Sequence, residues 1–324
     1  MALTSRVSLT GPDTAEPEDI FGSSLAIIFP DDVVNSHGDP HHGLLYTSPH
    51  LPHPLQLSLA EVSAEADRYL FSHYLWNSSL LLAELIEADT LGLGRGGGGD
   101  SSPSSLSPSG ISTGALRPPS PAFNVTGLST IELGAGTALP SILSGLLGAR
   151  RVVVTDYPTP PVLKTLRHNV GSMVQPKFSP PGRFEVEEVL VDGHAWGELD
   201  SVFAQRNRHA FDRVFLADCL WMPSQHENLR RSVAWFLGEG EGSRAWVVAG
   251  FHTGRETVGA FFRAEVLAAI GLEVEAMWER DCNGQEREWA WNRGIEDVSV
   301  RKRWLVVAVL RRILKTAGGG DEVP

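Results

Sequence analysis

Cysteine is scarce in this chain, which has only Cys219 and Cys282 among 324 residues. The two are far apart and are not spaced as metal ligands, so no disulfide framework is expected and the count suits a reducing compartment. No apolar run approaches the ~18 residues of a membrane span. The first twenty residues also lack the apolar core of a signal peptide. We therefore expect a cytoplasmic protein without a membrane partner, with the nucleus as the alternative.

Basic charge is also in short supply. Lys and Arg total 27 against 39 Asp and Glu, a net charge of −12, which argues against a nucleic acid as main partner. A basic protein or a neutral small molecule fits better, although acidity can simply maintain solubility. Histidines gather at positions 37, 41, 42, 50 and 53. They lack an accompanying cysteine or a regular helical spacing, so we predict loop histidines and no metal site.

Apolar residues are nearly absent from residues 92–121, where Gly, Ser and Pro fill 21 of 30 positions. Such a segment cannot bury enough surface to fold, so we predict a disordered insert. It lies within a domain at 76–312, an interdomain linker being the alternative. Residues 1–75 read as an N-terminal extension over the active site, with about the first 15 disordered. Residues 313–324 read as a disordered tail.

Strand-like and helix-like runs alternate after the insert. This alternation predicts an α/β fold with a doubly wound, Rossmann-like sheet and right-handed crossovers. The last two strands follow each other without a strong helix, which predicts an antiparallel hairpin at one edge. The predicted strands are 129–133, 151–156, 183–192, 212–218, 244–252, 272–280 and 301–312, and the predicted helices are 78–88, 138–148, 160–170, 226–237 and 256–270.

A glycine-rich turn, "ELGAGTALPS", follows the strand at 129–133. Doubly wound sheets bind ligands at the carboxyl ends of their strands, and Gly134 and Gly136 let a ligand approach the backbone closely. Asp156 ends the next strand, 24 residues after Glu132, and can accept hydrogen bonds from both hydroxyls of a ribose. A dinucleotide site needs a third small residue where Leu139 stands. The turn therefore favours S-adenosylmethionine over a dinucleotide.

Further segments at the same sheet edge strengthen this interpretation. With "LWN", "ELGAGTALPS", "VVVTDYP", "NV" and "LADCLW" in that order, the chain resembles the seven-strand methyltransferases of the lysine methyltransferase group. It is most similar to the fungal nicotinamide N-methyltransferase-like branch, which includes protein N-terminal and lysine methyltransferases acting on a translation elongation factor. The resemblance covers most of residues 16–90 and 122–312. It implies S-adenosylmethionine as the methyl donor and a cofactor site of Trp76, Gly134, Ala135, Gly136, Asp156, Trp196 and Ala217, with Glu132 in support.

The substrate side is less defined. Protein-lysine members often carry D-x-x-Y where this chain has "DCLW", Asp218 to Trp221, so the phenol hydroxyl is missing. A lysine acceptor, with a free pKa of ~10.4, must lose its proton before transfer. Orientation can be worth up to ~7–11 kcal/mol, so we expect no indispensable base. We predict that Asp218, Trp221, His226 and His252 lie nearest the acceptor nitrogen.

Each of these positions has a plainer alternative. Trp76 and Trp196 can be core aromatics, Asp218 can cap a turn, and His226 can simply begin a helix. At the level of function, we predict an enzyme, monomeric, that methylates a protein amine, either a lysine or an N-terminal amine. The alternatives are a methyltransferase for a small amine such as nicotinamide and a non-catalytic adaptor that kept the fold.

Overall fold

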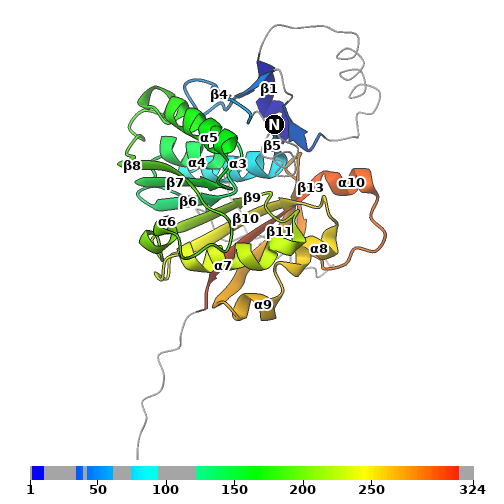
Figure 1. Cartoon of the computed structure of the whole chain (residues 1–324). Helices are drawn as coiled ribbons and strands as arrows, with labels where there is room; N and C mark the ends of the chain where they lie inside the picture. Colours follow the sequence, from blue (N-terminus) through cyan, green and yellow to red (C-terminus); the bar gives the residue numbers. More distant parts are fainter. Residues whose placement is uncertain (1, 11–33, 39–41, 61–73, 94–121, 314–324) are drawn as a thin grey trace, which may run out of the picture.

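The computed structural model describes residues 2–10, 34–38, 42–60, 74–93 and 122–313. Its centre is an eight-stranded sheet in the order β12-β11-β13-β10-β9-β6-β7-β8 (Figure 1). From β10 to β8 the neighbouring strands are parallel, whereas β13 is antiparallel to both β10 and β11. The strands are β6 (Ser129–Leu133), β7 (Arg151–Asp156), β8 (Glu188–Gly193), β9 (Arg213–Ala217), β10 (Arg244–Gly250), β11 (Leu272–Asp281), β12 (Glu286–Glu288) and β13 (Trp304–Arg312).

The central strands are covered on both faces. Every residue of β6 is buried, as is every residue but the first of β7, β9 and β10. This burial explains their continuous apolar and β-branched runs. The predicted α/β fold with a doubly wound sheet and an antiparallel edge hairpin is confirmed, and the strands predicted at 129–133 and 151–156 coincide with β6 and β7.

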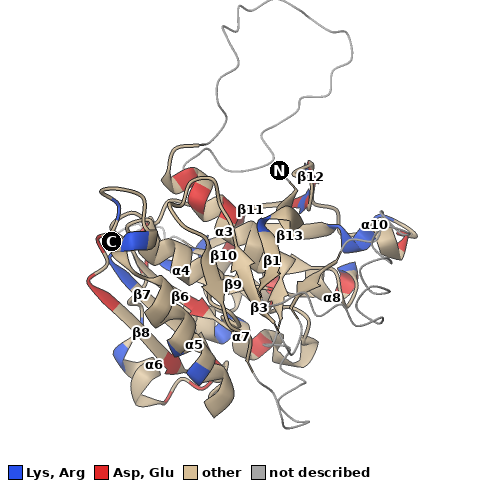
Figure 2. Cartoon of the chain, turned by 90° about the horizontal axis from the view of Figure 1, so that it is seen from above, with Lys and Arg blue, Asp and Glu red and all other residues tan. Residues whose placement is uncertain are grey.

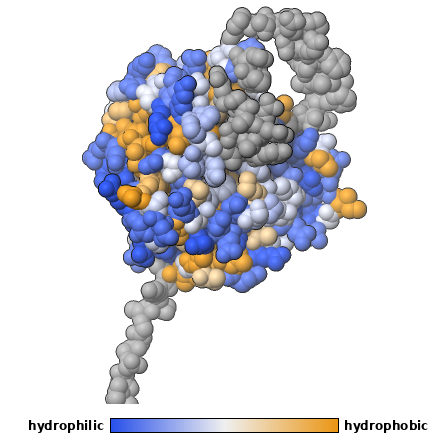
Figure 3. Space-filling view, in the orientation of Figure 1, coloured by the Kyte–Doolittle hydropathy of each residue, from blue (hydrophilic) through white to orange (hydrophobic). Residues whose placement is uncertain are grey.

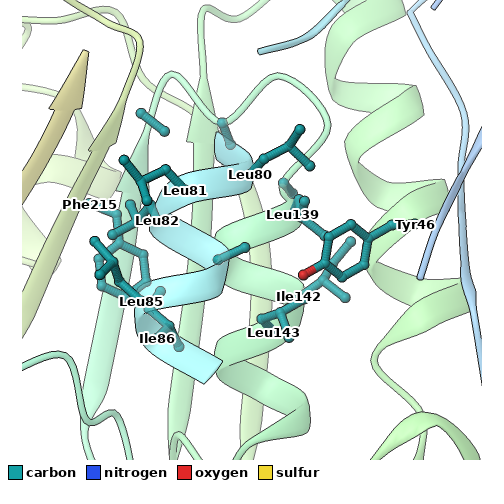
Figure 4. Close-up of a cluster of buried hydrophobic side chains, with 14 of the residues drawn as sticks. Tyr46, Leu80, Leu81, Leu82, Leu85, Ile86, Leu139, Ile142, Leu143 and Phe215 are labelled. Atoms are coloured by element: carbon teal, nitrogen blue, oxygen red, sulfur yellow. The ribbon is translucent and has the colours of Figure 1, made fainter. Parts of the chain in front are cut away.

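Helices form a layer on each face of the sheet (Figure 1). The layer of α3 (Asn77–Thr90), α4 (Leu139–Leu146) and α5 (Pro160–Met173) packs into one apolar cluster. The layer of α6 (Val202–Arg206), α7 (His226–Phe236), α8 (Arg255–Ala260) and α9 (Ala264–Ala268) packs into the other. Figure 4 shows leucines of α3 against Leu139, Ile142 and Leu143 of α4, with Phe215 of β9 beneath them. The shorter elements in this part of the chain are η2 (Pro176–Phe178), η3 (Pro223–Gln225) and α10 (Val298–Lys302).

Several elements differ from the prediction. The strand predicted at 183–192 begins only at Glu188, and the strand predicted at 301–312 begins at Trp304, because residues 301–302 belong to α10. The single helix expected over 256–270 is broken into α8 and α9, because Phe261 and Phe262 close a tight turn by donating their N–H groups to Val258 and Gly259. The sheet also gains an eighth strand, β12, which pairs with Trp278–Arg280 of β11. Its sequence, "ERE", has no apolar pattern that would indicate a strand.

Ordered structure begins nearer the N-terminus than predicted. Residues 2–10, predicted to be disordered, form η1 (Leu3–Arg6) and β1 (Val7–Thr10). They are held because the buried Arg6 guanidinium donates to Glu87 of α3 at 3.0 Å and to the Tyr46 hydroxyl at 3.3 Å. β1 pairs with β3 (Gly43–Tyr46), which pairs with β4 (Leu55–Leu57), and β2 (Ser36–His37) pairs with β5 (Leu75–Trp76). The predicted disorder of residues 11–15, of most of the insert (94–121) and of the tail (314–324) lies outside the described residues.

None of the helices in the described ranges combines the length and apolar character that crossing a bilayer requires.

Candidate active site

A cavity of about 400 Å³ lies at the carboxyl ends of the parallel strands. The turns after β6, β7, β8 and β9 and the start of α3 form its wall, as expected for a doubly wound sheet. Its lining residues are Tyr74, Trp76, Ser79, Gly134, Ala135, Gly136, Thr137, Asp156, Tyr157, His194, Ala195, Trp196, Ala217, Asp218, Cys219, Trp221, Met222 and Gln225. They include two carboxylates and no Lys or Arg, so this described wall favours a neutral or cationic ligand.

The glycine turn after β6 is tied to β7. The backbone N–H groups of Gly134 and Ala135 both donate to the Thr155 carbonyl oxygen at 3.0 Å. Gly134 has a φ of +71°, and a Cβ there would lie 2.9 Å from Cζ2 of Trp196. Both the backbone conformation and the close indole therefore require glycine at this position.

Asp156 is held in place by the same turn. Its Oδ2 accepts a hydrogen bond from the Gly136 N–H at 2.8 Å, and its Oδ1 accepts one from the Tyr157 N–H at 2.7 Å. Burial raises the pKa of Asp156, and these two backbone donors offset part of that rise. Each carboxylate oxygen keeps a lone pair for another donor, which is the arrangement that two neighbouring hydroxyls of a ribose require.

Asp218 and Trp76 line the cavity, and His252 contacts both of them from behind this part of the wall. The Asp218 Oδ2 lies 2.9 Å from Nε2 of His252, and its Oδ1 accepts a hydrogen bond from the Gly250 N–H at 3.0 Å. The His252 ring packs against Trp76 with 5.0 Å between ring centroids. Burial lowers the pKa of His252, but the adjacent Asp218 carboxylate outweighs burial and raises it overall. His252 is not itself a lining residue, and a quarter of its side chain is exposed.

Asp218 is also in an unusual backbone conformation. Its φ is +60°, one of three positive values at non-glycine residues in the described chain. A non-glycine residue in this region stores roughly 1–3 kcal/mol of strain, a feature that gathers at functional sites. In this conformation the Asp218 N–H donates to the Val248 carbonyl oxygen at 2.8 Å, while the Asp218 carboxylate accepts from Gly250 at the end of β10.

Three predicted site residues do not line the cavity: His252, described above, His226 and Glu132. His226 is 5% exposed, and its Nε2 lies 2.9 Å from the Leu220 carbonyl oxygen, so it holds the loop before α7 in place. Glu132 is fully buried, and its Oε2 accepts hydrogen bonds from the Ser141 N–H at 3.1 Å and the Ser141 hydroxyl at 2.5 Å. It faces α4 because Ile131 and Leu133 face the opposite layer. Glu132 therefore supports the turn rather than a ligand directly.

The structure adds lining residues that sequence reasoning missed. Tyr74, Tyr157 and His194 each lie within two residues of a predicted position, so that proximity was the available signal. The other added lining residues lie close in sequence to a predicted position or in a turn that folds toward the cavity. They are Ser79, Thr137, Ala195, Cys219, Met222 and Gln225. Tyr74 is the one described residue of the predicted extension, 1–75, in the cavity wall. Coverage of the cavity by the rest of that extension stays a prediction.

Comparison with known proteins identifies the fold and chemistry. Residues 65–264 match the family model described as lysine methyltransferase. The chain belongs to the lysine methyltransferase family. As a member it is an S-adenosylmethionine-dependent methyltransferase, so the enzyme class, the donor and the family predicted above are confirmed.

Its relatives include several fungal enzymes. The "Protein N-terminal and lysine N-methyltransferase EFM7" of Gibberella zeae is 31% identical over 222 residues, which cover 64% of this chain and 69% of that protein. The protein of the same name from Yarrowia lipolytica is 32% identical over 48% of this chain, and the one from Schizosaccharomyces pombe is 28% identical over 60% of it. The chain spans 59% and 60% of the lengths of these two relatives.

Solved structures are more distant. A putative RNA methyltransferase, PH1948, from Pyrococcus horikoshii has a TM-score of 0.44 at 12% identity, with 80% of this chain and 94% of that chain covered. The mitomycin 7-O-methyltransferase MmcR has a TM-score of 0.41 at 14% identity, with 78% and 59% covered.

The cavity fits the donor in two independent respects. Its wall contains buried polar atoms without a hydrogen-bond partner among the described residues, namely Thr137 Oγ1 and His194 Nδ1. Burial lowers the pKa of His194 to about 4, so its imidazole is neutral at physiological pH. The Gly134 turn also lines the cavity with backbone rather than with a side chain. A nucleoside with an amino-acid end carries many polar groups. It therefore requires polar atoms that are free to form hydrogen bonds, next to backbone that it can approach closely.

Proposed function

We propose that this enzyme methylates a protein amine, either a lysine side chain or an N-terminal amine. The relatives named above as protein N-terminal and lysine N-methyltransferases support this acceptor class. The observation that carries the proposal is the Asp218–His252 pair, which lies against Trp76 at the cavity that fits the donor. A translation elongation factor is the first acceptor to test.

Donor binding is assigned to the strand-end residues. Asp156 accepts hydrogen bonds from the two ribose hydroxyls, and the backbone of Gly134 to Gly136 lies against the amino-acid end. His194 is placed to meet the base, since its Nδ1 is buried and unpaired among the described residues. When bound, S-adenosylmethionine supplies an electrophilic methyl group on a positively charged sulfur. Asp156 and Asp218 stabilise that charge, and no described lining residue is a cation that would oppose it.

The acceptor amine is assigned to the side of Trp76, Asp218 and Trp221. Indole faces attract a cation within ~6 Å, so the two tryptophans hold the incoming ammonium. With Asp218 ionised, Nε2–H of His252 donates to the carboxylate and Nδ1 keeps its lone pair. His252 Nδ1 then takes the proton of the ammonium, which frees the nitrogen lone pair. The neutral amine could then accept the electrophilic methyl group that the donor would supply when bound, with the donor's sulfur as the leaving group.

The size of the cavity also favours an amine carried on a larger molecule. About 400 Å³ is near the lower end of the 300–1,000 Å³ that one small-molecule ligand occupies. The donor would take most of that volume, which leaves a narrow approach for a slender alkylamine. A heteroaromatic ring such as nicotinamide would need additional space beside the donor.

The experiment is methyl transfer from isotope-labelled S-adenosylmethionine by the full chain. A protein extract, a purified elongation factor and nicotinamide are supplied separately. We expect label in protein, with mass spectrometry locating it on a lysine or an N-terminal amine, and with Asp156→Asn as the inactive control. Label in nicotinamide alone would show that the enzyme is a small-molecule methyltransferase. Donor binding without transfer to any acceptor would favour the non-catalytic adaptor.

A further inference from the structure

A second hollow, of about 510 Å³, begins at α8, three residues after His252 in the sequence. It is bounded by α8, by the segment before α10 and by α10 itself. Its lining residues are Arg255, Glu256, Gly259, Ala260, Arg263, Trp291, Asn292, Arg293, Gly294, Glu296 and Arg301. We refer to this set as the arginine hollow. None of its members lines the donor cavity, so it is a separate feature of the surface.

The floor of the arginine hollow is rigid. Arg255 is 7% exposed and donates to Glu296 through Nε and Nη2, both at 2.8 Å, and to Glu279 through Nη1 at 2.5 Å. Arg287 and Arg293 also pair with the fully buried Glu279. Three guanidinium groups thus surround two carboxylates, which holds β11, β12 and the segment before α10 in one arrangement.

Two arginines at the rim of the hollow have no neutralising partner within the described ranges. Arg263 is exposed and Arg301 is partly exposed, and among the described residues neither side chain has a hydrogen bond or an ion pair. The lining contains four arginines and only two glutamates, on a chain whose net charge is −12. In Figure 2, basic residues are seen at α10, with acidic residues near them.

Apolar side chains surround the same rim. Of the eleven large hydrophobic residues exposed in the described chain, four fall between positions 291 and 300: Trp291 at 57%, Ile295 at 105%, Val298 at 55% and Val300 at 52%. Figure 3 shows apolar atoms protruding on the side of the molecule that carries α10 in Figure 1. Exposed tryptophan and arginine side by side are the residues that most often carry binding energy in protein interfaces.

The hollow is close to the reacting centre. His252, which packs on Trp76, and Arg255, on the hollow floor, are three residues apart. Three residues span at most ~11 Å, since an extended chain advances ~3.3–3.6 Å per residue. The floor of the arginine hollow at Arg255 therefore begins within ~11 Å of the His252 backbone.

We infer that the arginine hollow is a docking site for an acidic, apolar segment of the acceptor protein. Carboxylates of that segment pair with Arg263 and Arg301, and its apolar side chains pack on Trp291 and the aliphatic residues around it. A nucleic acid fits less well, because its phosphate backbone does not use exposed tryptophan, isoleucine and valine side chains. That this segment belongs to the acceptor protein rests on the proposed function.

The test is fluorescence anisotropy with the full chain and a labelled peptide, DELWEDLD. Its basic counterpart, KKLWKKLK, and an eight-nucleotide oligothymidine serve as comparison probes. We expect the acidic peptide to bind at least tenfold more tightly than either probe. Arg263→Glu combined with Arg301→Glu should weaken it at least tenfold, and Trp291→Ala by about threefold to tenfold.

A matched control separates local contact from overall charge. Lys164→Glu combined with Arg167→Glu changes the charge equally on an exposed face of α5 and should leave peptide affinity within about twofold. Thermal stabilisation by S-adenosylmethionine should be the same in all variants, which shows that each is folded. Equal binding to wild type and the Arg263/Arg301 variant, tighter binding of the oligothymidine, or no binding of the acidic peptide would each overturn the inference.

Transfer kinetics then connect the docking site to the acceptor. The Arg263/Arg301 variant should raise KM for the protein acceptor about tenfold with kcat and donor affinity unchanged. If the acidic peptide binds as expected but no protein is ever methylated, the proposed function fails and the docking site stands. If a protein is methylated with an unchanged KM, the proposed function stands and the docking site is not used by the acceptor.

Discussion

Asn in place of Asp156 tests the proposed donor site most directly. The side chain keeps its shape but loses its charge, and one oxygen becomes an NH₂ group that cannot accept from the N–H of Gly136 or Tyr157. A hydrogen bond to a charged group contributes about 1.5–3 kcal/mol. Two ribose hydroxyls would therefore lose about 3–6 kcal/mol, which raises the donor Kd by about 10²–10⁴-fold.

Calorimetry and thermal unfolding measure this loss independently. At a donor concentration of 100 times the wild-type Kd, binding stabilises the wild type by about 2.7 kcal/mol. A variant whose Kd is 100-fold higher gains only about 0.4 kcal/mol at that concentration. Asp192→Asn is the matched control, because Asp192 also lies near a strand end and accepts from a backbone N–H but does not line the cavity. If Asp156→Asn bound the donor within threefold of wild type, the assignment of Asp156 to the ribose would be refuted.

Three further changes test the remaining parts of the site. Gly134→Ala should destabilise the fold by about 2–4 kcal/mol in urea unfolding and abolish donor binding, because φ is +71° and the new Cβ meets Trp196. His252→Gln should lower kcat/KM by about 10²-fold at pH 7.5. Since His252 must be neutral to take a proton and Asp218 raises its pKa, wild-type kcat/KM should rise with pH through a point above 6.5, and the variant should lack that rise. Burial raises the pKa of Glu132 from 4.5 to about 8, so between these values the folded state holds a proton that the unfolded state has lost. The free energy of unfolding should therefore fall as pH rises, and at pH 7 this contribution should be about 3 kcal/mol smaller than at a pH below 4.5. Glu132→Gln should remove that dependence. A pH-independent difference between wild type and Glu132→Gln would contradict the buried, protonated carboxyl.

The parallel strands and their order of appearance could be predicted because their signal is local. A strand that is covered on both faces needs an uninterrupted apolar run, and "RVVVTD" is such a run. Gly134 and Asp156 could be placed together for a related reason, since adjacent parallel strands bring their carboxyl ends to one edge. The confirmed family and donor follow from those same segments.

Other features depend on which elements meet in space. Glu132 was expected near a ligand because it lies at the end of a predicted strand. His226 was expected there because it follows the loop after the strand at 212–218. Glu132 instead binds Ser141, and His226 instead binds the Leu220 carbonyl. A buried polar side chain takes whichever partner packing brings to it, and the sequence does not list the candidates. Asp218 and His252, 34 residues apart, were predicted to share the acceptor site, but their direct hydrogen bond emerged only from the folded chain.

The arginine hollow is the clearest case of this difference. Residues 282–301 show no periodic apolar pattern, so the chain alone indicates a charged loop there. Folding buries Glu279 among arginines from α8, β12 and the segment before α10, and Arg263 and Arg301 remain at the rim of the hollow. Local pattern is enough for strands and turns, because backbone conformation and burial act over a few residues. Long-range contacts set which polar groups are paired, which are strained and which are left for a ligand, because electrostatic and packing energies depend on distances between segments that the linear order does not encode.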